Sequence, residues 1–251
     1  MDNINQSPKI VFEDPYIAVI DKPAGMIVNN ADTSKKMYTL QDWVFENIKI
    51  EKTEDMSVFN ARNGIVHRLD KETSGLIIIA KNEQSFKNLQ EQFKSGNVSK
   101  VYIALVHGKV VPNEGEINVP IGRLPWNRMR FGVLAEGRES KTLYKVIGDF
   151  SATNAKISGN EKDENTYSLV EVYPKTGRTH QIRVHFKHLG YPIVSDSLYV
   201  GRKISKKDRK ILSRHFLHAK KIFFQHPNTQ KKVSFESELP PELVDFMRLL
   251  G

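Results

Sequence analysis

A polar loop runs directly into an apolar strand in the first third of the chain. Residues 64–73 (GIVHRLDKET) are mostly polar and begin with glycine, whereas residues 74–81 (SGLIIIAK) contain four consecutive large apolar residues. This arrangement is typical of a reactive side chain that is held at the edge of a rigid sheet. The sequence therefore singles out Asp70, whose carboxylate precedes the strand.

Capping and periodicity signals predict three helices among short strands. Thr39 begins the first with a capping-box variant, Asn82 begins the second, and Gly96 ends it. The third follows a turn at residues 174–177 and ends at Gly190. Strands are expected at residues 10–12, 16–20, 98–107 and 167–172. Short strands with few helices favour an α+β fold with a largely antiparallel sheet.

The charge of the chain indicates a polyanionic partner. Lys and Arg number 38 against 29 Asp and Glu, a net charge of +9. Residues 201–221 hold nine of the basic residues and one acidic residue, Asp208, so this segment is either a solvated surface helix or a phosphate-facing surface. The chain has no cysteine, which excludes disulfides, thiolate metal sites and cysteine nucleophiles.

We expect a single domain over residues 1–251. Residues 1–9 form a polar tail without the apolar core of a signal peptide, and residues 151–165 are polar and aperiodic, as in a surface loop. With so short a tail, an additional amino-terminal domain is not expected. No apolar stretch has the length of a membrane span, so a cytoplasmic protein is expected.

Taken alone, the candidate residues have ordinary alternatives. Asp70 could cap a turn, because Asp in loops usually binds nearby backbone amides. Arg183, on the third helix, could simply be solvated, and Tyr102 could be a common strand aromatic. These alternatives stay open on the local sequence.

Five blocks of sequence resemble the RluA-type pseudouridine synthases in content and in order. They are residues 21–25 (DKPAG), 64–81, 100–108 (KVYIALVHG), 176–185 (TGRTHQIRVH) and 217–219 (LHA). The resemblance covers about residues 10–240. It implies the pseudouridine synthase fold, a bent, mixed, largely antiparallel sheet with flanking helices and a central catalytic cleft, here without an S4 domain. Relatives commonly have glycines near Ser195 and Val200, where this chain differs.

The resemblance also implies the chemistry. Asp70 would be the catalytic aspartate of an RNA pseudouridine synthase, Arg183 its ion-pair partner, and Tyr102 the aromatic that stacks on the target base. Arg68 would fill the space left by a flipped uridine. The reaction moves one uracil from N1 to C5 attachment, so neither metal nor nucleotide cofactor is expected.

The expected partner is structured RNA, either rRNA or tRNA, bound by a monomer. His67 either positions its loop or contacts phosphate. The further candidates for phosphate contact are basic: Lys22, Lys100, Arg178, Arg202, Lys203, Lys206 and Lys207.

Two other classes of function are compatible with parts of the sequence. A non-catalytic RNA-binding or ribosome-assembly protein could use the same fold. Such a protein would not need Asp70, Tyr102 and Arg183 together. A metal-dependent hydrolase could use the pairs His185 with His188 and His215 with His218, but a third ligand is not apparent. Residues 137–142 (GRESKT) end like a phosphate-binding loop. They lack its leading glycine and the glycine directly before Lys141, so ATP use is not supported.

Overall fold

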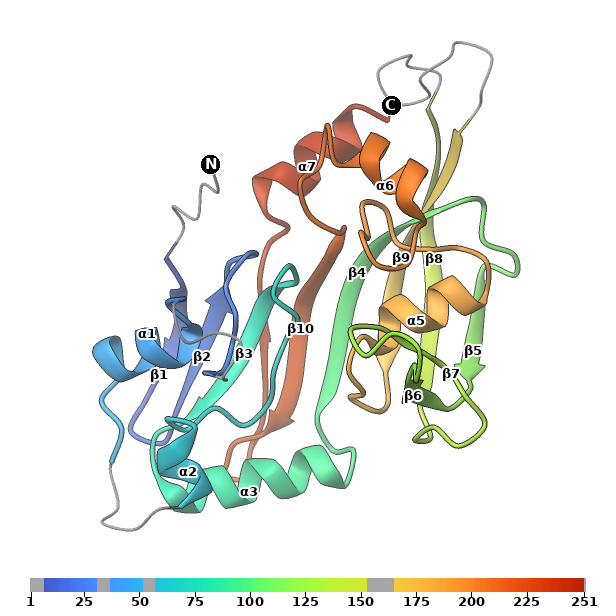
Figure 1. Ribbon diagram of the computed structural model, residues 1–251. Coiled ribbons are helices and arrows are strands. Elements are labelled where there is room, and N and C mark those ends of the chain that lie inside the picture. Colours follow the sequence, from blue (N-terminus) through green and yellow to red (C-terminus); the bar gives the residue numbers. More distant parts are fainter. Residues whose placement is uncertain (1–6, 31–36, 52–56, 153–164, 251) are drawn as a thin grey trace. The chain divides into compact units, whose positions relative to one another are not determined.

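The computed structural model describes residues 7–30, 37–51, 57–152 and 165–250 (Figure 1). The chain forms two compact units, the first from residues 1–100 and 219–238 and the second from residues 101–218 and 239–251. The single catalytic domain stays a prediction. Most of the predicted tail and of the predicted loop at 151–165 lies outside the described residues, and the described ends of that loop belong to strands.

The first unit is a sheet with three helices. Its strands β1, β2 and β3 follow one another in the sheet, β10 lies next to β3, and β11 pairs with β10. The pairs β1 with β2, β2 with β3, and β10 with β11 are antiparallel. The elements are β1 (Lys9–Glu13), β2 (Ile17–Lys22), α1 (Leu40–Asn47), α2 (Val58–Ala61), β3 (Ser74–Ala80), α3 (Glu83–Lys94), β10 (Leu217–Gln225) and β11 (Lys232–Glu236).

The apolar run of the sequence forms β3, and all seven of its residues are buried. One face of β3, with Leu76 and Ile78, packs in a core with Phe86 and Leu89 of α3. Full burial explains why this strand lacks the alternation of apolar and polar residues that a half-exposed strand shows. The strand therefore gives the preceding loop a rigid support.

The predicted helix ends are confirmed in the first unit. The Thr39 hydroxyl accepts a hydrogen bond from the Asp42 N–H, and the Asp42 carboxylate accepts one from the Thr39 N–H, which completes the capping box. Asn82 Oδ1 accepts from the Ser85 N–H at 2.8 Å. Gly96 adopts a φ of +76° after α3, the left-handed conformation that ends helices.

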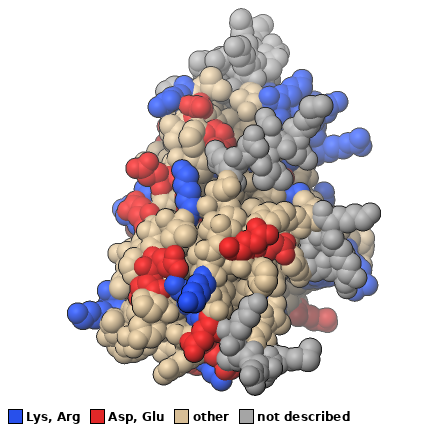
Figure 2. Space-filling model, turned by 90° about the vertical axis from the view of Figure 1, so that its left-hand side faces the viewer, with Lys and Arg blue, Asp and Glu red and all other residues tan. Residues whose placement is uncertain are grey.

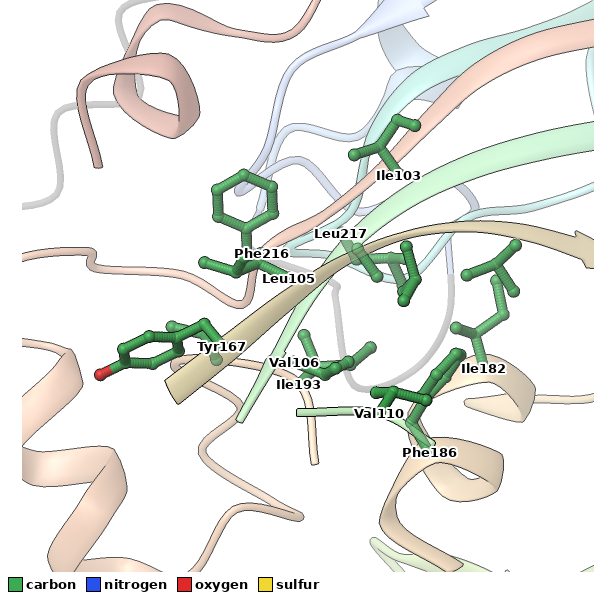
Figure 3. Packing of buried hydrophobic residues seen from close by; sticks show 14 of the residues in the cluster. Ile103, Leu105, Val106, Val110, Tyr167, Ile182, Phe186, Ile193, Phe216 and Leu217 are labelled. Atoms are coloured by element: carbon green, nitrogen blue, oxygen red, sulfur yellow. The ribbon is translucent and has the colours of Figure 1, made fainter. Parts of the chain in front are cut away.

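The second unit is an antiparallel sheet in the order β4, β9, β8, β5, with a separate β6–β7 hairpin. Ile182 and Phe186 of α5 belong to the same core as Ile103 and Leu105 of β4 (Figure 3). The elements are β4 (Ser99–His107), β5 (Glu114–Asn118), β6 (Ile121–Arg123), β7 (Phe131–Val133), β8 (Lys141–Ala152), β9 (Asn165–Pro174), α5 (Gln181–His188), α6 (Arg202–Asp208) and α7 (Pro241–Arg248). The predicted α+β class is confirmed.

Charge is mixed over one face of the molecule. Figure 2 shows acidic and basic side chains interspersed there, so the positive net charge is not gathered on that face. None of the helices in the described part of the chain has the length and apolar character needed to span a bilayer.

Gly75 at the start of β3 generates a test of this packing. Its φ is +114°, and a Cβ at this position would overlap the backbone of Ala219 in β10. Gly75→Ala should lower the free energy of unfolding by about 3 kcal/mol or more, because strain and a backbone clash act together. Urea denaturation followed by circular dichroism measures this loss.

Gly96→Ala is the matched control. Its φ of +76° is also left-handed, but a Cβ there meets no atom within 4 Å among the described residues. This variant should lose only about 1 kcal/mol, from backbone strain. Equal losses in the two variants would contradict the close approach of β3 and β10.

Candidate functional site

The loop that carries Asp70 is fastened to the first unit at several points. At its start the Gly64 carbonyl accepts from the Ala80 N–H at 2.9 Å, and a Cβ on Gly64 would overlap the Ala80 carbonyl. The Asp70 carbonyl accepts from the Thr73 N–H at 3.1 Å, which closes a turn. The Asp70 side chain is partly exposed. Asp70 thus stands on a constrained backbone and is only partly buried.

His67 fastens the middle of this loop to β3. Its Nε2 accepts a hydrogen bond from the Ile78 N–H at 3.0 Å, and its ring lies 4.6 Å from the Phe93 ring. Burial lowers the pKa of His67 from 6.5 to about 3, and the nearby Lys100 acts in the same direction. A neutral acceptor suits loop positioning, the first of the two predicted roles, and does not suit phosphate contact.

Lys22 corrects one predicted phosphate contact. The side chain is 0% exposed, and its ammonium donates to the carbonyls of Pro23, Met26 and Lys71 at 2.8, 3.0 and 3.3 Å. The Lys71 carbonyl also accepts from the Gly25 N–H at 2.8 Å. A buried ammonium with carbonyl partners cannot reach RNA, so the prediction for Lys22 is wrong. It fastens the residue next to Asp70 instead.

The remaining candidates of the first unit differ in exposure. Arg68 is exposed, as a side chain that enters RNA would need to be. Lys100 lies over the Phe93 ring at 5.8 Å, and burial lowers its pKa to about 8. A phosphate contact by either residue stays a prediction.

Arg183 in the second unit makes a buried, bidentate ion pair with Asp196. Its Nε donates to Asp196 Oδ2 at 2.7 Å and its Nη2 donates to Oδ1 at 2.9 Å. The two residues are 5% and 0% exposed. The guanidinium also lies 5.1 Å from the Tyr199 ring. These contacts fix the position of Arg183.

Asp196 stays ionised in this buried position. Burial acts to raise its pKa, but the hydrogen bonds and charge of Arg183 outweigh burial, with help from His215 and the Leu198 N–H, so its pKa lies below the ordinary value. The Leu198 and Tyr199 N–H groups donate to Oδ1 at 3.0 and 3.2 Å. The Asp196 carboxylate therefore accepts hydrogen bonds both from the Arg183 side chain and from the backbone that follows Asp196.

Ser195 has a backbone conformation that favours glycine. Its φ is +61°, in the left-handed region that favours glycine. Its hydroxyl is buried and has no hydrogen-bond partner among the described residues. Its N–H donates to Asp208 at 3.0 Å, and its carbonyl accepts from Arg209 Nε at 3.1 Å. The turn that presents Asp196 is thus tied to the end of α6.

Gln181 and Tyr102 occupy defined positions near the start of α5 and on β4. The Gln181 side chain accepts from the Arg178 N–H at 3.0 Å and donates to Thr142 at 2.9 Å, which closes the turn before the helix. Tyr102 pairs with Val172 of β9 and packs partly buried against the core. Its role with a base stays a prediction.

The basic segment at 201–221 separates into surface and structural residues. Arg202, Lys203 and Lys206 are exposed and Lys207 is partly exposed, as phosphate contacts require. Arg178 is partly buried and donates through Nε to the Glu139 carbonyl at 3.0 Å.

Three other residues of this segment correct the view of it as one phosphate-facing surface. Arg214 is 5% exposed and binds Glu242, while Lys220 and Lys221 pair with Glu236.

His185, which pairs with His188 in the sequence, has a structural role. Its Nδ1 lies 2.9 Å from Thr142 Oγ1, and its Nε2 lies 3.3 Å from the Ser140 hydroxyl. Burial lowers its pKa to about 4. In the described ranges no group of three His, Cys, Asp or Glu side chains could hold a metal ion.

The candidates are divided between the two units. Asp70 and Arg68 belong to the first unit, and Tyr102 and Arg183 belong to the second. The ion pair between Arg183 and Asp70 stays a prediction. The sequence did not identify Asp196, although it stands in the segment after α5 where the chain departs from its relatives.

Comparisons with known proteins agree on one family. The family model described as RNA pseudouridylate synthase matches residues 16–188. A protein named "Uncharacterized RNA pseudouridine synthase" from Chloroflexus aurantiacus is 39% identical, over 92% of this chain and 65% of its own length. "Ribosomal large subunit pseudouridine synthase D" from Pseudomonas aeruginosa is 35% identical, over 96% of this chain and 71% of its own. The chain thus spans about two thirds of these relatives.

A solved structure confirms the fold. "Human RNA Pseudouridylate Synthase Domain Containing 1" aligns with a TM-score of 0.70 at 24% identity. The alignment covers 97% of this chain and 89% of the human chain.

Asp196→Asn should destabilise the second unit, because it leaves the Arg183 guanidinium buried beside a neutral partner. We expect a loss of about 3–5 kcal/mol in the free energy of unfolding, measured with urea at pH 7. In the parent, the pKa of Asp196 is lowered, so the stability contributed by the Arg183–Asp196 pair is present above pH 3.8 and is lost as the pH falls below it.

The control is Asp245→Asn, whose pair with Arg248 is exposed and should contribute less than about 1 kcal/mol. Similar losses would contradict the assigned role.

His67 should stay neutral in the folded protein. Its ring nitrogens should show no titration between pH 8 and pH 5 in NMR spectra, with the proton on Nδ1, because Nε2 accepts from Ile78. In urea the ring should titrate near 6.5. The unfolded chain thus takes up a proton that the folded chain refuses, so this group lowers stability as the pH falls from 6.5 toward 3. Titration of the folded His67 near pH 6.5 would contradict a neutral ring that accepts from the Ile78 N–H.

Proposed function

The chain belongs to the RNA pseudouridylate synthase family, and from this membership we propose that it isomerises uridine in RNA to pseudouridine with Asp70 as the catalytic carboxylate. The reaction breaks the N1–C1′ bond of uridine and joins C5 of the same uracil to C1′. The observation that carries the assignment is the fastening of the Asp70 loop. Gly64, His67 and the Lys71 carbonyl are each bound to other parts of the first unit.

One carboxylate is enough for this chemistry. A glycosidase needs one group for the leaving oxygen and a second to handle water. Here the leaving uracil is itself the nucleophile that returns, so no water enters the product. Asp70 can attack C1′, attack the base or remove the 2′ proton, and each route requires an ionised and positioned carboxylate.

Arg183 is proposed to keep Asp70 ionised. A guanidinium lowers the pKa of an adjacent carboxyl group and offsets the effect of burial. The pair with Asp196 supports this role, because two hydrogen bonds to one carboxylate orient the Arg183 guanidinium. Tyr102 is proposed to stack on the target uracil, as a flat apolar surface for a base removed from its helix.

Base flipping is proposed to use Arg68. The exposed guanidinium would occupy the space that the uridine leaves, and this compensates for lost stacking. The phosphate contacts proposed for the second unit are Arg178, Arg202, Lys203, Lys206 and Lys207. They have the exposure that RNA contact needs, in whole or in part.

The proposed substrate is RNA of the large ribosomal subunit. The support is the name of the Pseudomonas aeruginosa relative, which assigns that protein to the large subunit. We further propose that the protein acts as a monomer in the cytoplasm, without a metal or nucleotide cofactor. Transfer RNA is the alternative substrate.

The decisive experiment is tritium release from RNA labelled at uracil C5. RNA is taken from cells that lack the protein, and no metal or nucleotide is added. The parent should release tritium, and Asp70→Asn should reduce the rate at least about 1,000-fold, because no other carboxylate substitutes for it. Asp245→Asn, an exposed carboxylate of α7, is the control and should react like the parent.

Two results would contradict the proposal. An Asp70→Asn variant that reacts like the parent would remove Asp70 from the chemistry. A parent that binds this RNA without releasing tritium would favour the non-catalytic RNA-binding alternative. Running ribosomal and transfer RNA separately decides between the two substrate classes.

A further inference from the structure

The β6–β7 hairpin exposes large apolar side chains on a basic segment. Trp126 and Met129 are each 77% exposed, the highest values for large hydrophobic residues in the described part of the chain. Arg128 and Arg130 are exposed beside them, and residues 121–135 contain no acidic residue. Trp is rarely so exposed without a partner, because its ring is the largest apolar side chain.

The tip of this hairpin is ordered by its own hydrogen bonds. Arg123 Nη1 donates to the Arg128 carbonyl at 2.7 Å, and the Leu124 N–H donates to the Arg130 carbonyl at 3.0 Å. The Arg130 N–H donates to the Asn127 carbonyl at 2.9 Å. The turn is therefore fixed while the Trp126 ring stands in solvent. A fixed turn reduces the entropy lost when a ligand binds.

The base of the hairpin is fastened to the surroundings of Arg183. The Phe131 N–H donates to the Tyr199 hydroxyl at 3.0 Å, and the Phe131 ring meets the His180 ring edge-on at 5.5 Å. The Tyr199 ring lies against the Arg183 guanidinium. The base of the hairpin is therefore packed against the residues that surround Arg183.

We propose that the hairpin tip binds a single-stranded segment of the substrate RNA, with an unpaired base stacked on Trp126 and phosphates bound by Arg128 and Arg130. This inference rests on the proposed function and deepens it. An exposed aromatic ring among basic residues is the combination that single-stranded nucleic acid recognises. Bases inside a duplex are stacked on each other and offer no free face, so the occupant is unpaired RNA.

Tryptophan fluorescence tests the stacking directly. The chain has two tryptophans, so Trp43→Phe leaves Trp126 as the only one. The probes are a 12-nucleotide oligouridylate and the same strand in a duplex with oligoadenylate. The single strand should quench Trp126 emission, and the duplex should leave it unchanged. Equal quenching by both probes would overturn the stacking.

Affinity measurements separate stacking from general apolar contact. Trp126→Ala should weaken oligouridylate binding about tenfold or more, since one stacked base contributes roughly that factor. Trp126→Phe should keep most of the affinity, whereas Trp126→Leu should behave like the Ala variant. Phe45→Ala removes another exposed aromatic, on α1, and should change nothing. A Leu variant that binds as well as Phe would overturn the proposal.

The arginines are tested by salt dependence. The double change Arg128→Gln with Arg130→Gln should reduce the slope of log affinity against log salt by about 1.4, or 0.7 for each lost phosphate contact on a single strand. An unchanged slope would remove both arginines from the interface.

Tritium release distinguishes failure of the hairpin proposal from failure of the proposed function. If the parent reacts and Trp126→Ala binds and reacts equally well, the hairpin proposal fails and the proposed function stands. If the parent releases no tritium but binding depends on Trp126, the proposed function fails and the hairpin proposal stands.

Discussion

The ammonium of Lys22 is a full charge without access to water, and the backbone around Asp70 is arranged to satisfy it. An isolated buried charge would destabilise the fold by far more than a typical domain's stability. Three carbonyls compensate, and one of them belongs to Lys71, the neighbour of Asp70. A shift of the loop would remove a partner from the charge. The Lys22 charge therefore opposes displacement of the Lys71 carbonyl.

In the second unit, the buried Arg183 guanidinium is stabilised in a different way from the Lys22 ammonium. The Arg183 guanidinium has a carboxylate partner, Asp196, which is presented by a turn with Ser195 in a left-handed conformation. A planar cation with fixed donors matches a carboxylate better than single carbonyls do. Both units therefore use a buried basic side chain to position other groups, although the sequence motifs around Lys22 and Arg183 look like surface basic motifs.

Features decided by near neighbours could be predicted from the sequence. Thr39, Asn82 and Gly96 mark helix ends because the groups they satisfy lie within a few residues. Lys22 and Arg214 could not be predicted, since their partners lie up to 49 and 28 residues away and a basic side chain on its own suggests solvent. Asp196 was missed because its partner, Arg183, lies 13 residues away on a different element. The candidate residues followed from the family blocks, whereas their supporting contacts required the structure.

Helix α6 combines a buried end with an exposed basic face. Asp208 is 7% exposed and binds both His107 Nε2 at 2.9 Å and the Ser195 N–H. Arg202, Lys203 and Lys206 take no part in that attachment. The face can therefore be redesigned independently of its anchor: its charges can be exchanged to suit a different polyanion while Asp208 keeps the turn before Asp196 in place. For protein engineering, the exposed side chains of α6 can be changed without removing the Asp208 contacts that attach the helix.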